Sequence, residues 1–334
     1  MHIKRRFLSK IKSEPILIGI LHLIGLLSLY KDADQTKPGR PYVYPTTVIL
    51  RCFVVRIWFR IPSNNALHYF LSADTRYHNK IMSACGLHSL PDRRTFDRRF
   101  KVLPIQNIVS SMGLRFLREN LAESHVGAVD SAIVSCKKVW HKSDMKKNRI
   151  PVSGIDTDAR WGFSKSKGWV FGYKLHMCCS TGKVSVPLTA TVSTANIYDP
   201  HRYDVLVKPL AGLMPYMAAD SLYSSEELYY TSKEMGVTPV CPIRRYRHTK
   251  GIRLKRYHFF GSKKGQWIIR RRNSIERLFD RMKDTFGIEP LPVRGRYNVS
   301  SYVLMCVFVY QIAIYYNCMM GVSKPQCVKH MLGN

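Results

Sequence analysis

The order of apolar patterns after residue 121 restricts the fold of this chain more than any other feature. Three strand-like runs come first, at residues 125–135, 170–179 and 183–193, and a Ser-Thr-Gly turn separates the last two. Helical and strand-like runs then alternate as helix 200–213, strand 215–219, helix 224–235, strand 237–241 and helix 273–286. This order predicts an α/β fold, with one mixed β-sheet and helices on its faces.

The preceding part of the chain has a mainly helical pattern. Residues 46–60 are apolar at helical spacing, and Pro91 opens a short helix that is rich in arginine. That helix carries Arg93, Arg94 and Arg98, which makes it a candidate for insertion into a DNA groove. A solvated basic face on an ordinary helix explains the same pattern equally well. We therefore expect a helical N-terminal region for DNA binding or dimerisation (1–120), an α/β domain (121–320) and a tail (321–334).

The net charge limits the partners of the chain. Its 53 Lys and Arg residues against 22 Asp and Glu residues give a formal charge of +31. Such a charge destabilises a compact chain by self-repulsion unless a polyanion compensates it. Nucleic acid or an anionic membrane surface is therefore the first partner to consider. The nine cysteines contain no C-x-x-C pair, which favours reduced thiols in a cytoplasmic protein.

Two apolar stretches imitate membrane segments. Residues 16–30 follow a basic start, as in a signal peptide, but they are short for a membrane span and no good cleavage site follows them. Residues 302–320 are longer, and Gln311 and Asn317 interrupt them. We expect the second stretch to be a helix buried on all sides, and we expect no membrane partner.

Three acidic residues are placed where metal-dependent chemistry needs them. Asp130 lies inside an apolar strand, where a carboxylate is costly unless it is paired or bound to a metal. Asp220 follows strand 215–219, at the edge where open sheets place their sites. Glu276 lies in the first turn of helix 273–286. Carboxylates that converge from separate elements suit two hard cations, Mg²⁺ or Mn²⁺, acting on a phosphodiester.

Each acid also has a structural explanation. Asp130 fits a hydrogen-bonded core acid, and Asp220 fits a cap on the following turn. Asn273 and Glu276 have the spacing of a capping box, which explains the glutamate without catalysis. Asp199 is expected to cap a helix or to support the site from a distance, and His176 with Cys178 and Cys179 is expected to pack in the core.

The residues around the three acids resemble insertion-sequence transposases of the DDE family. Asp130 in AVDSAI, Asp220 in AADSLYSS and Glu276 in RRRNSIERLFDRMK match the three acids of that pattern. The stretches FGYKLH, TANIYDPH, GVTPVCPIRR and LPDRRTFDRRF are also similar to the family. The resemblance implies that the α/β domain is an RNase H-like catalytic domain, in which the three acids are catalytic and bind the two metal ions.

The helix that carries Glu276 has a second family feature. Arg272, Glu276 and Lys283 fall on one stripe beside its apolar face. They match a Tyr-x2-Arg-x3-Glu-x6-Lys signature of one branch of the family, although Ile269 occupies the tyrosine position. On this stripe the acid would hold metal and the two cations would hold phosphates. A salt-bridged surface stripe is the alternative.

Two clusters of cations lie beside the acids in sequence. Residues 241–272 contain twelve Lys and Arg residues, no acid and several aromatic residues, among them Trp267. Cations follow phosphates and aromatic faces stack on unpaired bases, so this composition favours DNA contact over a solvated charge run. The expected DNA-binding residues of the two clusters are Arg244, Arg245, Trp267, Arg270, Arg271, Lys137 and Lys138.

The resemblance implies a transposase that cleaves double-stranded DNA at element ends and joins the 3′-OH to target DNA. It also implies work as a dimer or higher complex on paired ends, for which we expect a homodimer. We expect a cytoplasmic, nucleoid-associated location. A nuclease of the same fold that does not join strands is one alternative. A transposase-derived DNA-binding protein without catalysis is another, although all three acids are present.

Overall fold

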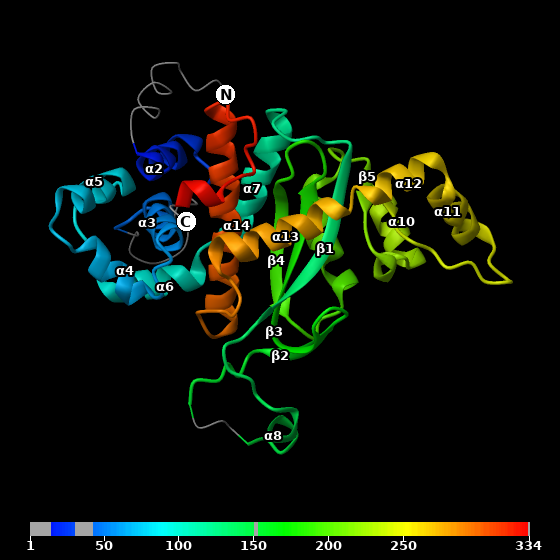
Figure 1. The fold of residues 1–334 in the computed structure, drawn as a ribbon, viewed down its shortest axis with the longest axis horizontal. Helices are drawn as coiled ribbons and strands as arrows, with labels where there is room; N and C mark the ends of the chain where they lie inside the picture. The colour runs from blue at the N-terminus through cyan, green and yellow to red at the C-terminus, as the bar shows by residue number, and fades with distance from the viewer. Residues whose placement is uncertain (1–14, 31–42, 150–152, 333–334) are drawn as a thin grey trace.

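A six-stranded mixed sheet forms the centre of the molecule, with a group of helices on one side and a pair of basic helices on the other (Figure 1). The computed structural model describes residues 15–30, 43–149 and 153–332. The strands are β1 (Val126–Ser135), β2 (Arg160–Ser164), β3 (Gly168–Ser180), β4 (Pro187–Thr194), β5 (Tyr216–Ala218) and β6 (Thr238–Val240). Their order is β2-β3-β1-β5-β6, and β4 also pairs with β3.

The strand directions match the fold expected for the α/β domain. β1, β2 and β4 each pair with β3 in the antiparallel direction, whereas β5 and β6 are parallel to β1. The interior strand β1 places apolar side chains on both faces, as a strand covered on both sides requires. The mixed sheet predicted from the sequence is therefore confirmed. β2 is an additional strand that the apolar pattern does not indicate.

The N-terminal region is helical, as predicted. Its helices are α2 (Ile16–Leu27), α3 (Thr46–Trp58), α4 (Asn64–Leu71), α5 (Arg76–Cys85), α6 (Arg93–Val102) and α7 (Ile105–Arg118). Local chemistry sets their boundaries, because Ser63, Thr75 and Asp92 each accept a backbone N–H in the first turn of the helix that follows. Gly86 ends α5 at φ 80°, a left-handed conformation that glycine adopts without strain.

One long helix joins the N-terminal helices to the sheet. α14 (Arg296–Met319) contacts α2, α3 and α6 on one side and α7 and β4 on another. It is long and apolar enough to cross a membrane by composition, but 94% of its most apolar window is buried inside the protein. Gln311 inside it donates to the carbonyl oxygens of Val109 and Pro187, and Asn317 donates to the carbonyl oxygen of Pro325, so both amides that interrupt the apolar run are used in packing. α14 is therefore the buried core helix that the sequence predicted.

The remaining helices agree with the sequence only in part. α10 (Glu226–Glu234) and α13 (Asn273–Phe286) lie where periodicity predicts them. The single helix predicted over 200–213 is wrong, since that segment forms η1 (Asp199–Arg202), α9 (Tyr203–Val207) and η2 (Lys208–Leu210). The basic segment contains two helices that the pattern did not indicate, α11 (Gly251–Gly261) and α12 (Lys263–Arg270). Short elements α8 (Lys142–Lys146), η3 (Ser221–Tyr223) and η4 (Lys329–Leu332) complete the chain.

Candidate active site

Asp130 lies in the middle of β1 and faces α13. It is paired across the sheet with Met177 of β3. One carboxylate oxygen accepts the backbone N–H of Ser131 at 2.8 Å. Burial raises the pKa of Asp130 to about 6, and the negative charges of Asp220 and Asp199 act in the same direction, against the Ser131 hydrogen bond and the cation Arg272. This acid therefore lies in a negatively charged, poorly solvated place.

The strand register brings Asp220 next to Asp130. Ala128 of β1 pairs with Ala218, the last residue of the parallel strand β5, and Asp130 and Asp220 each follow two residues after this pair. Asp220 also accepts the backbone N–H of Leu222 at 2.8 Å and caps η3, as the sequence predicted for a turn cap. Burial raises the pKa of Asp220, because the charged form loses solvation there.

Glu276 reaches the same place from α13 through a shared arginine. One guanidinium nitrogen of Arg272 lies 2.6 Å from a carboxylate oxygen of Asp130, and the other lies 2.5 Å from a carboxylate oxygen of Glu276. α13 crosses the sheet over β1, which allows this contact (Figure 1). Arg272 is thus the group that joins two acids lying far apart in the sequence.

The capping box predicted for this helix is wrong. Arg272, not Asn273, is the N-cap residue, and it has helical dihedral angles and no capping hydrogen bond from its side chain. Helix α12 ends only two residues earlier, so the chain enters α13 almost without interruption. Glu276 therefore makes no capping contact and instead pairs with Arg272, as the stripe of Arg272 and Glu276 predicted.

A second charged group lies near the acids. Asp199 does not cap a helix with its side chain, contrary to one expectation from the sequence. Its carboxylate lies 2.8 Å from the ammonium group of Lys174 and 3.7 Å from Nδ1 of His176. Burial lowers the pKa of His176 to about 4, so this imidazole is neutral near pH 7. The pair Lys174–Asp199 is a feature of the site that sequence reasoning missed, although Lys174 lies within the family-like stretch FGYKLH.

Tyr223 is another residue that sequence reasoning missed. It is fully buried, and within the described ranges its hydroxyl has no hydrogen-bond partner. Burial raises the pKa of Tyr223 well above its usual value, and the charges of Asp199, Asp130 and Asp220 raise it further. Three acids thus act on one buried hydroxyl, which places that hydroxyl beside the candidate site. Its position three residues after Asp220 was the available signal.

The three carboxylates suit a hard divalent cation, although the guanidinium of Arg272 lies between those of Asp130 and Glu276. Among the residues described, no group of three or more His, Cys, Asp or Glu side chains is arranged to hold a metal ion. Asp130 and Glu276 nevertheless share one cation, the guanidinium of Arg272, and Asp220 follows the neighbouring strand. Carboxylate oxygens from separate elements are the ligands that Mg²⁺ and Mn²⁺ prefer. The donor set therefore fits the metal expected from the sequence.

The predicted DNA-binding residues fall into exposed and paired groups. Arg93, Arg94 and Arg98 on α6 are exposed, whereas their neighbour Arg99 is buried and donates to Tyr44 and Thr46. Lys137, Lys138, Arg244, Arg245 and Arg270 are exposed as well. The structure therefore keeps five of these cations and the α6 arginines available to a phosphate backbone.

The other predicted contacts are partly engaged within the protein. Arg271 pairs with Glu123 at 2.7 Å and lies over the ring of Trp267, which is 41% exposed. The ammonium group of Lys283 lies 3.3 Å from a carboxylate oxygen of Glu289, whereas Glu276 pairs with Arg272. Ile269, at the signature's tyrosine position, packs against the hydrophobic core. The metal and DNA roles of all these residues stay predictions.

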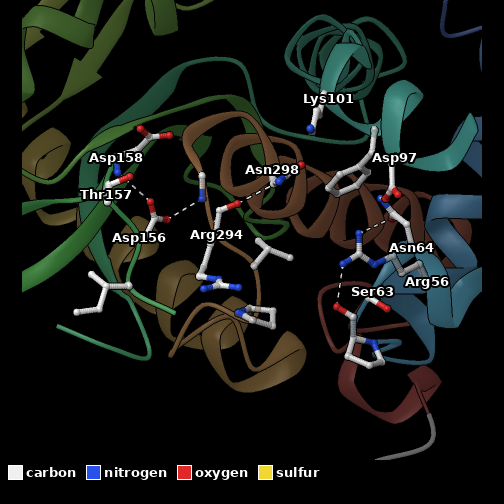
Figure 2. Close-up of a pocket in the computed structure, with 16 residues that line it drawn as sticks. Arg56, Ser63, Asn64, Asp97, Lys101, Asp156, Thr157, Asp158, Arg294 and Asn298 are labelled. Atoms are coloured by element: carbon white, nitrogen blue, oxygen red, sulfur yellow. Dashed lines mark hydrogen bonds between the residues drawn. The ribbon is translucent and has the colours of Figure 1, made fainter. Parts of the chain in front are cut away.

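A cavity lined by Asp156 and Asp158 is not part of the acid site. This cavity, of about 620 Å³, lies between the N-terminal helices and the start of α14 (Figure 2). Asp156 and Asp158 line it, and their carboxylates accept the backbone N–H groups of Gly295 and Arg296, which begin α14. On its other side Arg56 donates to Asn64. These polar groups stabilise the junction of the two regions.

Comparisons with known proteins identify the family. The model of the transposase DDE domain matches residues 123–312, which span the sheet and most of α14. A search of curated proteins found no match. A cryo-EM structure of a piggyBac transposase synaptic complex with hairpin DNA aligns over 95% of this chain and 76% of that chain, with a TM-score of 0.40 and 11% identity. By the match to more than half of its length, the chain belongs to the DDE transposase family.

Proposed function

We propose that this transposase cleaves DNA at element ends and joins the freed 3′-OH to target DNA, with Asp130, Asp220 and Glu276 as its catalytic acids. The observation that carries the proposal is the meeting of Asp130 and Glu276 on one guanidinium group, from a strand and a helix far apart in the sequence. The register of β1 and β5 supports the third acid. Mg²⁺ or Mn²⁺ bound by these acids, as two ions, would activate the attacking oxygen and stabilise the leaving one.

The proposed reaction consists of two successive transfers at phosphorus. In the first, the oxygen of a water molecule bonds to the phosphorus at the element end, the P–O3′ bond breaks, and the 3′ oxygen leaves as a hydroxyl. In the second, that hydroxyl attacks a target phosphodiester, and the target's own 3′ oxygen leaves. Asp130 contributes a carboxylate whose charge is poorly solvated, so its affinity for a cation is high.

Arg272 has two roles in this proposal. Its guanidinium pairs with both Asp130 and Glu276. A bound strand brings phosphate oxygens, which are acceptors of the same planar donor, so Arg272 orients the strand beside the acids. Lys283, which is on the same helix, extends the cationic side of the site toward the far end of β1, where Glu289 holds it at 3.3 Å.

The assembly and location follow from the same function. Two element ends must be held together for joining, so we propose a homodimer in the active complex, located on the cytoplasmic nucleoid. The +31 charge supports a polyanionic partner. The division into N-terminal, catalytic and tail regions at residues 120 and 320 also stays part of this proposal.

Strand transfer by purified protein tests the proposal. The substrate is a labelled duplex that carries the DNA flanking the gene, together with a supercoiled target and Mg²⁺. We expect joined products from the wild type, none from Asp130→Asn, and wild-type levels from Asp284→Asn, an exposed acid that pairs only with Lys329 among the described residues. Nicked DNA without joining would favour a nuclease. A wild type that binds DNA but is as inert as Asp130→Asn would favour a non-catalytic DNA-binding protein.

A further inference from the structure

We infer that an arm beyond the far end of β1 is a second contact surface for the DNA duplex that the acids act on. The arm consists of residues 137–149, which include α8, and of the β2–β3 hairpin from 160 to 169. It projects from the end of the sheet, away from the N-terminal helices and from α11 and α12 (Figure 1). The inference rests on the proposed function and assigns a place along the DNA to this surface.

The arm is strongly basic and its cations are exposed. Its two segments contain nine Lys and Arg residues and a single acid, Asp144. All nine cations are exposed: Lys137, Lys138, Lys142, Lys146, Lys147, Arg149, Arg160, Lys165 and Lys167. Charges of one sign this close together repel each other, and a row of phosphates would remove that repulsion.

Two aromatic rings project from the same arm. Phe163 and Trp169 are 60% and 59% exposed, and their ring centroids lie 5.7 Å apart. The ammonium group of Lys142 lies 3.3 Å from the centre of the Trp169 ring and 5.3 Å from that of Trp161. This contact holds α8 against the hairpin and combines aromatic and cationic groups in one surface. Exposed apolar side chains among cations fit the sugar and base edges of a DNA groove.

The sheet directs this surface and the acids to one side. Asp130 pairs with Met177, and Trp169 lies eight positions earlier on β3, so the pleat places all three side chains on the same face. Phe163 pairs with Trp169 and therefore shares that face. Eight residues of strand span at most about 26 Å. A duplex rises about 3.4 Å per base pair, so the aromatic pair of the arm lies within about eight base pairs of the acids.

The charge of the arm selects DNA over other occupants. A second copy of this chain carries the same +31 charge, and its own arm would repel this one. An anionic lipid surface would pair with the lysines. It would not explain why the arm lies on the same face of the sheet as Asp130, Asp220 and Glu276. DNA bound at the acids continues past them as a stiff rod and meets this face.

The salt dependence of DNA binding tests the lysines. The probe is a 40-base-pair duplex, and the protein is the full chain carrying Asp130→Asn, which cannot cleave it. The logarithm of the DNA-binding constant falls linearly with the logarithm of the salt concentration. Replacing Lys146 and Lys147 by alanine should make this slope less negative by about 1.8, because two phosphate contacts are lost. The matched control replaces Lys208 and Lys233, exposed lysines on η2 and α10, and should leave the slope unchanged.

A crosslinker tests the position of the aromatic pair. A benzoylphenylalanine in place of Phe163 should crosslink to DNA within about eight base pairs of the phosphodiester that the wild type cleaves. The same group in place of Tyr230, an exposed aromatic on α10, should not crosslink there. Phe163→Ser with Trp169→Ser should weaken binding at every salt concentration without changing the slope.

The outcomes separate the two proposals. A wild type that binds no DNA at any salt concentration overturns the proposed function itself. If the chain binds DNA but both arm variants keep the wild-type slope and affinity, only the arm inference is overturned. Loss of binding to phosphatidylglycerol vesicles, with DNA binding unchanged, would likewise overturn it in favour of a lipid surface.

Discussion

Replacing Asp130 by asparagine should stabilise the fold while removing the proposed activity. Burial raises the pKa of this carboxyl from its ordinary value of 3.8 to about 6, even with Arg272 beside it. The two values differ by about two pH units, and each unit corresponds to about 1.4 kcal/mol, so the charged form costs the folded chain about 3 kcal/mol at pH 7. Asparagine keeps the shape of the side chain and carries no charge.

The raised pKa of Asp130 also predicts how the stability difference between the two proteins changes with pH. A carboxyl group whose pKa is higher in the folded chain binds its proton more tightly there than after unfolding. The wild type should therefore lose stability relative to Asp130→Asn as the pH rises from 4 to 6, and the difference should stay near its maximum at pH 8. At pH 4 the two proteins should unfold at nearly the same urea concentration.

The assay is urea unfolding of both proteins, followed by tryptophan fluorescence at pH 4, 5, 6, 7 and 8. We expect Asp130→Asn to gain about 2–3 kcal/mol at pH 7 and above, and almost nothing at pH 4. Asp284→Asn, at an exposed acid, should show no such pH-dependent gain. An Asp130→Asn protein that is equal to or less stable than the wild type at pH 8 would show that burial of the charged Asp130 does not destabilise the fold.

Other perturbations test the packing around the site. Arg272→Ala leaves Asp130 without its cation. The unfolding free energy, measured by the same urea titration, should therefore fall by about 1–2 kcal/mol at pH 8 and by less at pH 4. Equal losses at both pH values would contradict this prediction. Arg56→Met removes a buried guanidinium that donates to Asn64 and to two backbone carbonyls. The free energy of unfolding, measured by thermal unfolding, should fall by about 3 kcal/mol. A change below about 0.5 kcal/mol would show that these contacts are absent. Gly113→Ala would place a Cβ 1.9 Å from a β4 carbonyl oxygen and should cost at least about 1–3 kcal/mol, while Gly261→Ala meets no atom and should be neutral; similar melting temperatures would contradict this difference.

Much of the sheet and the acids could be predicted because their signals are local. β1 is an apolar run with one carboxylate in it, and that carboxylate is Asp130. β5 is only three residues long, but it is apolar and directly precedes Asp220. The helical spacing of α13 places Arg272 and Glu276 on one stripe, and the structure joins them. Family-like motifs add the order of the three acids, which no periodicity supplies.

The missed features depend on contacts between distant segments. Arg99 and Arg256 are in basic stretches and would be expected on the surface, yet both are buried because carbonyl or side-chain acceptors surround them. The apolar pattern did not indicate α11 and α12, because basic residues and glycines interrupt the helical spacing of their apolar residues. Asn273 and Glu276 have capping-box spacing, but α12 precedes α13 so closely that no free helix end remains. Such outcomes are set by tertiary packing rather than by local propensity.

The most direct test of the three catalytic acids maps the bound metal on the polypeptide itself. Fe²⁺ with ascorbate and peroxide, added to the protein–DNA complex, produces radicals that cut the chain near a bound metal. We expect cuts near residues 130, 220 and 276, which disappear in Asp130→Asn and in excess Mg²⁺. Cuts at other places, or the same cuts in Asp130→Asn, would contradict the claim that these three acids hold the catalytic metal together.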